Sequence, residues 1–458
     1  MKNNTLLKEI IKHKKSWISS KMEQFPLENI KKQSIPSVRN FYQELTKPQK
    51  IFILECKKAS PTKGIIRKNF NLKNIANVYK HYASVISVLT DEKYFYGNFS
   101  FLTQISNMVK QPILCKDFII SSWQIFFARL HRADAILLML SILNDHDYKK
   151  LATVAHNLNM GVLTEVINQE EWQRAITLKA KVIGINNRNL HDLSINLDRT
   201  IDLARQKIKE TIVISESGIK KHQEILKLSK YVHGFLIGST LMAATDLNIT
   251  VRKLLFGENK VCGLTRIVDA QASYIAGAVY GGLIFIDKSP RRIDIFTAKT
   301  IISEIKSLLY IGVFCDAPIS HIIKVTQILK LHAVQLHGKE NQFYINQLRK
   351  KLPKYCQIWK VFNMNHKDTK VQYLNNINRY ILDNGGGSGK TFNWELIDNN
   401  INIKKNNIIL AGGLKEDNCI TAIKLKCAGL DFNSGVEIRP GIKNHNKLKK
   451  IFQIIKNL

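Results

Sequence analysis

Short apolar runs alternate with longer amphipathic stretches along the whole chain. The apolar runs are rich in Ile, Val and Leu, which is typical of strands buried on both faces. In the first half they occupy residues 51–55, 84–90, 113–117, 134–140, 161–166, 182–186, 211–215 and 232–237. Amphipathic stretches such as 148–158 and 219–228 separate them. The alternation predicts repeated βα units and a parallel sheet.

The same count restarts in the second half. Apolar runs there occupy residues 260–264, 281–286, 310–315, 333–336, 357–362, 379–383, 407–411 and 429–433. Eight βα units in about 200 residues favour a closed barrel over an open sheet. We therefore predict an α/β protein of two fused (β/α)8 TIM barrels, with domains at residues 1–257 and 258–458. No Pro-, Gly- or Ser-rich linker separates them, so the domains are expected to abut.

An N-terminal segment precedes the first predicted strand at residue 51. Its apolar positions Leu6, Leu7, Ile10 and Ile11 have helical spacing. We therefore expect a helical extension that caps an end of the first barrel.

Composition limits the class of protein. The seven cysteines are irregularly spaced without a Cys-x-x-Cys or His/Cys cluster, so neither a disulfide framework nor a metal site is predicted. The N-terminus lacks the apolar core of a signal peptide, and the longest apolar run, 135–143, is too short to cross a bilayer. These features predict a soluble, cytoplasmic protein without a membrane partner.

The net charge is +33, from 69 Lys and Arg against 36 Asp and Glu. A basic face that binds nucleic acid is one interpretation. Compositional drift together with an anionic small-molecule substrate is the other. We favour the second interpretation and expect no nucleic-acid partner, because the lysines are scattered and no zinc-finger spacing or aromatic–basic run occurs.

Each half ends in a pair of glycine-containing strand ends. The first half has VISESG at 213–218 and GFLIGS at 234–239, and the second has ILAGG at 409–413 and GLDFNSG at 429–435. Glycines let backbone N–H groups approach an anion, and the loops after strands seven and eight are a recurring phosphate site of barrels. Tight turns alone would explain one pair, but two pairs at the same strand positions favour phosphate binding.

Polar residues at the predicted strand ends are the candidates for catalysis, because barrel active sites lie at the carboxyl ends of the strands. Two lysines and two glutamates at one barrel mouth would shift one another's pKa values and could supply a general acid and a general base. For any single residue, a solvated ion pair on a loop is the alternative. The first-half candidates are Glu55, Lys57, Ser60, Lys116, Phe118, Glu165, Asn186, Arg188, Ser217 and Ser239.

The second half offers Cys262 and Asp383 at strand ends, His337 after the fourth strand, and Arg291 in the SPRR run. A lone cysteine is usually a buried filler. At a strand end beside Gly263, with cationic residues nearby, a thiolate base is an equally weighted interpretation.

The run NGGGSGKT at 384–391 nearly spells a P-loop, but Asn384 stands where the first glycine is required. A flexible linker is a second interpretation. Because the run follows a strand that ends in Asp383, we expect a loop that covers a ligand.

Longer motifs resemble two enzyme families. FILECKKASPTKG, PILCKDFI, GVLTEV, GINNRNL, ISESGI and GFLIGS are similar to indole-3-glycerol-phosphate synthase. KVCGLTR, KSPR, AVQLHG, YILDNGGGSGK, LAGGL and GLDFNSGVE are similar to phosphoribosylanthranilate isomerase. The resemblance covers almost the whole chain and implies a bifunctional enzyme of tryptophan biosynthesis, acting on phosphorylated anthranilate-sugar substrates. It also implies a monomer that needs no cofactor and no metal.

In the isomerase half, the resemblance implies an Amadori rearrangement of N-(5′-phosphoribosyl)anthranilate. Asp383 would be the acid that opens the ribose ring, and Cys262 the base that takes the C2′ proton. His337 and Arg291 match substrate-contacting positions. The phosphate-facing loops would contain Gly387, Ser388, Gly389, Gly412, Gly413, Ser434 and Gly435.

In the synthase half, the resemblance implies closure of the indole ring with loss of CO2 and water. Lys116 would be the general acid and Glu165 the base of the dehydration. Lys57 would lie near the substrate carboxylate or the leaving hydroxyl. The other matched positions orient or contact substrate or phosphate: Glu55, Asn186, Arg188, Phe118, Ser60, Ser217, Gly218, Gly238 and Ser239.

Two other functions are weighed against this one. A Schiff-base aldolase or sugar-phosphate isomerase would also use a strand-end lysine and phosphate loops, and a nucleic-acid-binding protein would use the basic residues. The pairing of Cys262 with Asp383 and the motif match stand against the first, and steep salt-dependent binding of DNA or RNA would support the second. One departure from the isomerase pattern is Cys315–Asp316, where Asn is expected in the second position, so the contacts of that loop are open.

Overall fold

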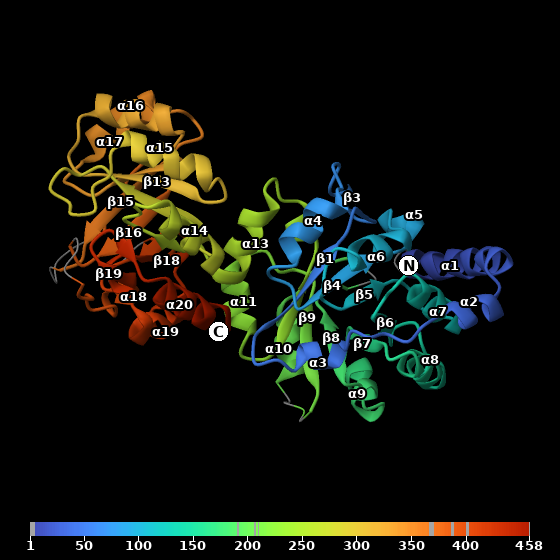
Figure 1. Cartoon of the computed structure of the whole chain (residues 1–458). Coiled ribbons are helices and arrows are strands. Elements are labelled where there is room, and N and C mark those ends of the chain that lie inside the picture. The colour runs from blue at the N-terminus through green and yellow to red at the C-terminus, as the bar shows by residue number, and fades with distance from the viewer. Residues whose placement is uncertain are drawn as a thin grey trace. The chain divides into compact units, whose positions relative to one another are not determined.

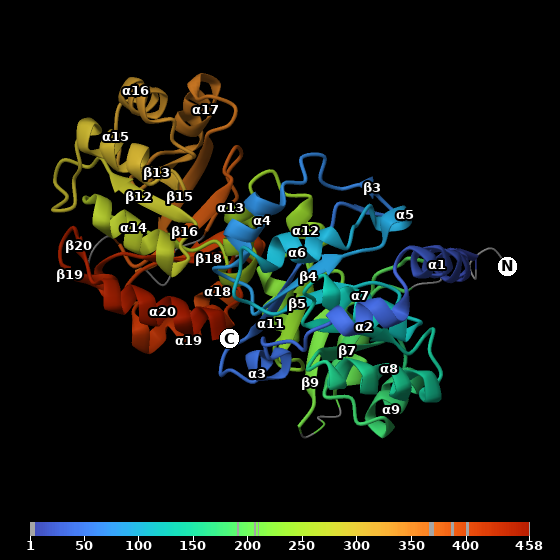
Figure 2. The ribbon, with the colours of Figure 1, turned by 45° about the vertical axis from the view of Figure 1, so that its right-hand side comes forward.

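The computed structural model describes residues 5–189, 192–205, 208, 210–365, 371–385, 389–399 and 403–457. These residues form two compact units, Met1–Lys220 with Glu224–Leu247 and Lys221–Gln223 with Asn248–Leu458. Each unit contains one closed barrel of eight parallel strands with helices around it, which confirms the predicted fold class (Figures 1 and 2). The domain boundary after residue 257 stays a prediction.

The first barrel has the strand order β1-β10-β9-β8-β7-β6-β5-β4, and β4 pairs with β1. Its strands are β1 (Ile51–Cys56), β4 (Val85–Leu89), β5 (Ile113–Lys116), β6 (Ala135–Met139), β7 (Gly161–Val166), β8 (Val182–Asn186), β9 (Ile212–Glu216) and β10 (Gly234–Ile237). The strands β2 (Ala59–Ser60) and β3 (Gly64–Ile65) form an antiparallel hairpin after β1.

Helices follow the strands of the first barrel. They are α4 (Leu72–Tyr79), α5 (Glu92–Phe95), α6 (Ser100–Ser106), α7 (Ser122–Leu130), α8 (Asp145–Asn157), α9 (Gln169–Thr177), α10 (Asp198–Ala204), α11 (His222–Leu228) and α12 (Ser239–Met242). The next helix, α13 (Leu247–Phe256), belongs to the second unit from residue 248 onward.

The second barrel runs from β11 to β18 in chain order and closes with a pairing of β11 and β18. Its strands are β11 (Lys260–Val261), β12 (Tyr280–Ile284), β13 (Leu309–Phe314), β14 (Ala333–Leu336), β15 (Gln357–Asn363), β16 (Arg379–Asp383), β17 (Ile408–Leu410) and β18 (Gly429–Phe432). A hairpin of β19 (Glu437–Arg439) and β20 (Ile442–Lys443) follows.

The helices of the second barrel include a long C-terminal one. They are α14 (Ile267–Ala276), α15 (Ile295–Glu304), α16 (Ile319–Leu329), α17 (Gln342–Lys351), α18 (Leu396–Asn399), α19 (Glu416–Lys424) and α20 (His445–Asn457), with 3-10 turns η1 (Lys405–Asn407) and η2 (Ser434–Val436). No helix within the described residues is long and apolar enough to cross a membrane.

Local sequence explains where many helices begin. A side-chain oxygen at the first position accepts a hydrogen bond from a backbone N–H of the opening turn, which satisfies a group that has no partner inside the helix. The residues that do so include Asn40, Asn71, Asp91, Ser121, Asn144, Asn168, Asp294 and Asn341.

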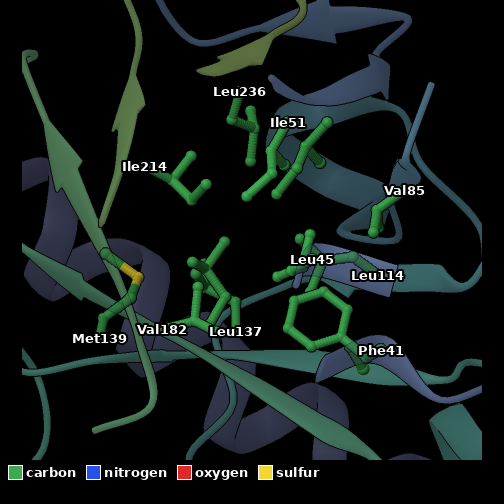
Figure 3. Packing of buried hydrophobic residues seen from close by; sticks show 13 residues of the cluster. Phe41, Leu45, Ile51, Val85, Leu114, Leu137, Met139, Val182, Ile214 and Leu236 are labelled. Atoms are coloured by element: carbon green, nitrogen blue, oxygen red, sulfur yellow. The ribbon is translucent and has the colours of Figure 1, made fainter. Parts of the chain in front are cut away.

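The N-terminal extension consists of α1 (Thr5–Gln24), α2 (Leu27–Gln33) and α3 (Phe41–Leu45). Phe41 and Leu45 pack into the hydrophobic interior of the first barrel (Figure 3). A side chain at Gly161, the first residue of β7, would collide with the Phe41 ring. Because Phe41 contacts the first residue of a strand, α3 closes the amino-terminal end of the barrel. The apolar pattern of the N-terminal extension predicted that it caps a barrel end.

Helix α1 is fixed near the opposite end of the first barrel by a buried lysine. The Lys14 Nζ lies 2.7 Å from a carboxylate oxygen of Asp91 and 2.7 Å from one of Asp117. Asp117 directly follows β5, and Asp91 follows β4 by two residues. Burying three charged groups is tolerated only because they satisfy one another, so this cluster fixes where α1 lies.

Replacing Phe41 by Ala is expected to destabilise the first barrel. Phe41 is 1% exposed, and its loss leaves a cavity, so the free energy of unfolding should fall by about 3–5 kcal/mol. Urea unfolding of the full chain measures this. The matched control is Phe296→Ala, since Phe296 is 81% exposed. Equal effects of the two substitutions would show that α3 does not seal the core.

Candidate active sites

A cavity of about 630 Å³ opens at the carboxyl ends of the strands of the first barrel. The structure brings all the candidate residues of the first half to its wall. They are Glu55, Lys57, Ser60, Lys116, Phe118, Glu165, Asn186, Arg188, Ser217, Gly218, Gly238 and Ser239.

Lys116, the last residue of β5, lies between two carboxylates. Its Nζ is 3.1 Å from Oε2 of Glu165 and 3.2 Å from Oε2 of Glu216. Burial lowers the pKa of Lys116, but the charges of Glu216, Glu165 and Glu55 outweigh burial and raise the pKa above its ordinary value. Lys116 therefore carries its proton at neutral pH.

For Glu216 at the end of β9, burial has the largest influence on the pKa. It is 1% exposed, and burial raises its pKa to about 7, against the opposing effect of Lys116. Its Oε1 has no hydrogen-bond partner among the described residues. A carboxyl that titrates near neutral pH beside a protonated lysine provides both protonation states that acid–base chemistry requires.

A second ion pair and an amide complete the polar wall. Lys57 Nζ lies 2.6 Å from Oε1 of Glu55. The Asn186 amide donates to Oε1 of Glu165 at 3.1 Å, and its oxygen accepts from the Arg188 backbone N–H at 2.9 Å. Asn186 thereby fixes the orientation of the Glu165 carboxylate.

The cavity has one apolar side. The rings of Phe118 and Phe95 lie 6.2 Å apart, between centroids, and both line the cavity. Leu6, Leu7 and Ile10 of α1 line it as well. An apolar wall that includes two phenyl rings suits a flat aromatic group.

Strained backbone marks another side of the cavity. Ser217 has φ 64° and Gly218 φ 89°, directly after β9. Gly238 follows β10, where a side chain would collide with the Glu55 carboxylate. Backbone bent in this way turns N–H groups toward a ligand, as an anion site requires.

Two features of this site were missed by the sequence reasoning. Glu216 lies in the ISESG run, between the predicted strand 211–215 and the candidate residue Ser217. Its place at a strand end could have identified it as a site residue. The contribution of α1 to the cavity wall had no such signal, because Leu6, Leu7 and Ile10 have the spacing of any amphipathic helix.

In the second barrel, Cys262 directly follows β11 and is 5% exposed. Its backbone N–H donates to the Phe432 carbonyl at 2.8 Å. The next residue, Gly263, has φ 67°, and a Cβ there would lie 2.9 Å from Cδ of Arg291. Glycine thus lets the Arg291 side chain pass beside the cysteine.

The guanidinium of Arg291 is held by Glu437 of β19. Arg291 Nε and Nη2 donate to both Glu437 oxygens at 2.7–3.1 Å. Lys443 of β20 lies 2.8 Å from the same carboxylate. Bidentate contacts of this kind fix the plane of the guanidinium.

His337 directly follows β14, Asp383 ends β16, and the two groups are near enough to interact electrostatically. Burial lowers the pKa of His337, and the charge of Asp383 acts in the opposite direction. The imidazole is therefore neutral at neutral pH. Its Nδ1 has no hydrogen-bond partner among the described residues, so it is available to a ligand.

The predicted phosphate loops of the second barrel lie against one another. A Cβ at Gly413 would lie 2.8 Å from the Gly389 carbonyl oxygen, and one at Gly389 would lie 3.9 Å from Oγ of Ser434. Gly412 and Gly413 have φ 85° and 60°. Gly435 packs on the Leu414 carbonyl. The loops after β16, β17 and β18 thus converge.

Two of the predicted phosphate contacts, Gly387 and Ser388, lie outside the described residues. The neighbouring Asn384 donates from its side chain to the Lys390 carbonyl at 3.0 Å. This bond joins the described residues on either side of 386–388 directly after Asp383.

The departure at Cys315–Asp316 fits the local backbone. Asp316 has φ 48°, a left-handed conformation that Asp tolerates nearly as well as Asn. Its side chain accepts from the Lys339 N–H at 2.7 Å, and its own N–H donates to Glu340 at 2.9 Å. The loop is therefore well bonded with Asp in this position.

The fold and the two strand-end sites define a two-domain barrel enzyme. The family model of indole-3-glycerol phosphate synthase matches residues 7–254, and that of N-(5'phosphoribosyl)anthranilate (PRA) isomerase matches residues 259–454. The chain is 54% identical to the tryptophan biosynthesis protein TrpCF of Yersinia pestis over 99% of this chain and 95% of that protein. It is 53% identical to the protein of the same name from Buchnera aphidicola subsp. Acyrthosiphon pisum, over 98% of each chain.

The chain belongs to the family of bifunctional tryptophan-biosynthesis proteins that join these two enzymes. Its C-terminal barrel isomerises N-(5′-phosphoribosyl)anthranilate to 1-(2-carboxyphenylamino)-1-deoxyribulose 5-phosphate. Its N-terminal barrel converts that product to indole-3-glycerol phosphate with loss of CO2 and water. The alternative of a nucleic-acid-binding protein is not supported by these relatives.

Substituting Glu216 by Gln is expected to impair the synthase alone. Gln keeps the size of the side chain but removes a charge that holds Lys116 protonated. The synthase kcat/KM should fall by at least about tenfold, since acid–base groups contribute about 10²–10⁴. The synthase is assayed with purified 1-(2-carboxyphenylamino)-1-deoxyribulose 5-phosphate, and the isomerase reaction of the same variant is the control. Unchanged synthase kinetics would exclude Glu216 from the site's function.

Proposed function

We propose that Lys116 is the general acid of indole ring closure. Its ammonium is held in the cavity between Glu165 and Glu216, and its raised pKa keeps it protonated. A proton given to the ketone oxygen makes the carbonyl carbon electrophilic. The ring carbon that carries the carboxylate then attacks it, and loss of CO2 restores the aromatic ring.

Glu165 is the base of the dehydration that follows. Its carboxylate is oriented by Asn186 and lies next to the Lys116 ammonium. It takes the proton whose removal forms the new double bond, while the hydroxyl leaves as water. Lys57 lies near the substrate carboxylate or this leaving hydroxyl, with Glu55 holding its ammonium.

The rest of the cavity positions the substrate. Phe118 packs on the anthranilate ring, in line with its place beside Phe95, and Arg188 contacts substrate. The sugar phosphate and neighbouring groups are contacted by Ser60, Ser217, Gly218, Gly238 and Ser239.

In the second barrel, Asp383 and Cys262 carry the proton transfers. Asp383 protonates the ribose ring oxygen, and the ring opens to an iminium ion. Cys262 as thiolate takes the C2′ proton, which gives an enol that becomes the keto product. Their positions at the ends of β16 and β11 put both groups at one barrel mouth.

Substrate contacts in the second barrel come from His337, Arg291 and the converging loops. The neutral imidazole of His337 can donate or accept a hydrogen bond. Arg291 provides a fixed positive charge beside Cys262. The phosphate is held by Gly387, Ser388, Gly389, Gly412, Gly413, Ser434 and Gly435.

The protein acts as a monomer in the cytoplasm, without a cofactor or a metal ion. The support is that each proposed set of residues comes from one barrel of one chain, so no residue of a second copy is required. The two activities divide at residues 1–257 and 258–458. Nucleic acid has no part in either reaction.

Cys262→Ala and Lys116→Ala are expected to block the pathway at different steps. With phosphoribosylanthranilate as substrate, the Cys262→Ala variant should not form 1-(2-carboxyphenylamino)-1-deoxyribulose 5-phosphate. The Lys116→Ala variant should form this intermediate and accumulate it. Each lost activity should fall by about 10²-fold or more. Loss of anthranilate-type fluorescence and formation of indole-3-glycerol phosphate measure the two steps.

Each variant should keep the activity of the unsubstituted barrel, and an unchanged urea-unfolding curve of the full chain would show that the substituted barrel is folded. Cys419→Ala is the matched control for removing a buried cysteine, because Cys419 is 0% exposed and lies in α19. It should keep both activities. A Cys262→Ala variant with normal isomerase kinetics would contradict the proposed base, and the same result for Lys116→Ala in the synthase would contradict the proposed acid.

A further inference from the structure

A lysine is buried inside the second barrel, one layer below Cys262. Lys260 is 0% exposed, and its Nζ lies 2.7 Å from Oδ2 of Asp431 on the paired strand β18. Taking two such charges out of water costs several kcal/mol per ion. Apolar side chains would fill the interior at lower cost, so the pair calls for a reason other than stability.

The Lys260 side chain runs alongside the cysteine. Side chains alternate along a strand, so Lys260 and Cys262 face the barrel interior together. Gly282 on β12 leaves the space for them, because a Cβ there would lie 2.6 Å from Cys262 Sγ and 3.0 Å from Lys260 Cε. The Lys260 ammonium is close enough to the Cys262 sulfur for its positive charge to lower the pKa of the thiol.

Other charged groups face the same space from neighbouring strands. Asp431 opposes the ionisation of Cys262, while Lys443 of β20 favours it. The charge of Asp383, at the end of β16, raises the pKa of Asp431. For His337, which follows β14, Lys260 lowers the pKa and Asp431 raises it. Oδ1 of Asp431 is buried without a hydrogen-bond partner among the described residues. Of these groups, Lys260 has the largest influence on the ionisation of Cys262.

We propose that Lys260 is a positioning residue of the isomerase, whose ammonium stabilises the Cys262 thiolate and aims it at the substrate. Asp431 holds the ammonium in place, and Gly282 provides the room. Lys260 keeps its own proton throughout, and the proton that Cys262 takes comes from C2′ of the substrate. This inference rests on the proposed role of Cys262 as the base.

The charges around Cys262 determine the pH at which its thiolate forms. Burial raises the pKa of Cys262 and Asp431 raises it further, so the pKa stays above its ordinary value; Lys260 is the strongest influence that lowers it, ahead of Lys443. Without the ammonium, the thiolate should form only at higher pH. If the pKa of Cys262 rises by about one, the thiolate fraction at neutral pH falls about tenfold.

The test replaces the lysine and follows the ionisation of Cys262 directly. Lys260→Met leaves Asp431 buried and unpaired, so the double variant Lys260→Met/Asp431→Leu supplies a second, apolar replacement of the pair. The readout is the pH dependence of ultraviolet thiolate absorbance, taken as the difference from the same protein carrying Cys262→Ser. The second readout is the pH profile of isomerase kcat/KM.

In both variants the midpoint of Cys262 ionisation should move to higher pH, and the rising limb of kcat/KM should move with it. The fall should lie mainly in kcat rather than KM, about tenfold for each pH unit by which the midpoint rises. Asp431→Asn, which keeps the ammonium and removes an opposing negative charge, should move the midpoint to lower pH.

The control is Lys360→Met. Lys360 is another buried lysine of this barrel, 2.9 Å from Glu340, and it does not bond to Cys262. Its removal should leave the Cys262 midpoint in place. If the folded double variant ionises Cys262 at the parent pH and keeps the parent profile, Lys260 is a structural ion pair only and the inference fails. Full isomerase activity in Cys262→Ala would instead overturn the proposed base, whatever the midpoint does.

Discussion

Lysine ammonium groups held among carboxylates inside closed parallel barrels are the constraint on which both sites depend. A barrel interior excludes water, so a charge there must be compensated by opposite charges at short distance. Lys116 meets this condition with Glu165 and Glu216, and Lys260 meets it with Asp431. The compensation fixes where each ammonium lies, and it also keeps each lysine protonated. A group that is fixed and protonated is ready to act on a substrate without rearrangement.

The charge-compensated lysine lies at a different height along its strand in each barrel. In the synthase, the lysine stands at the last residue of its strand and lines the cavity itself, so it can give its proton to a substrate. In the isomerase, the lysine lies two residues below the strand-end cysteine and is fully buried. The position of a lysine along its strand therefore decides whether its ammonium lines a cavity, as in Lys116, or lies enclosed below the strand end, as in Lys260.

The N-terminal extension shows how a segment outside the barrel becomes part of the site. Its helix α3 fills the amino-terminal end of the first barrel with Phe41, while α1 adds apolar residues to the cavity at the other end. The buried Lys14 joins α1 to Asp117, the residue after Lys116. The stability of this cluster and the shape of the cavity are therefore linked.

The sequence is sufficient to predict the two barrels and to locate the candidate residues at the carboxyl ends of their strands. Strands such as Gly161–Val166 and Arg379–Asp383 were predicted with their observed bounds, because continuous apolar runs between amphipathic helices have few other solutions. Strand-end residues could be chosen for the same reason, since parallel closure brings all carboxyl ends together. Only the packing of the folded chain shows which residues are neighbours: Lys116 lies between Glu165 and Glu216, α1 forms a wall of the cavity, and Lys260 lies beside Cys262. These contacts join residues far apart in the chain or on different layers of one strand, and a periodic pattern gives the face of a residue but not the neighbour across the barrel.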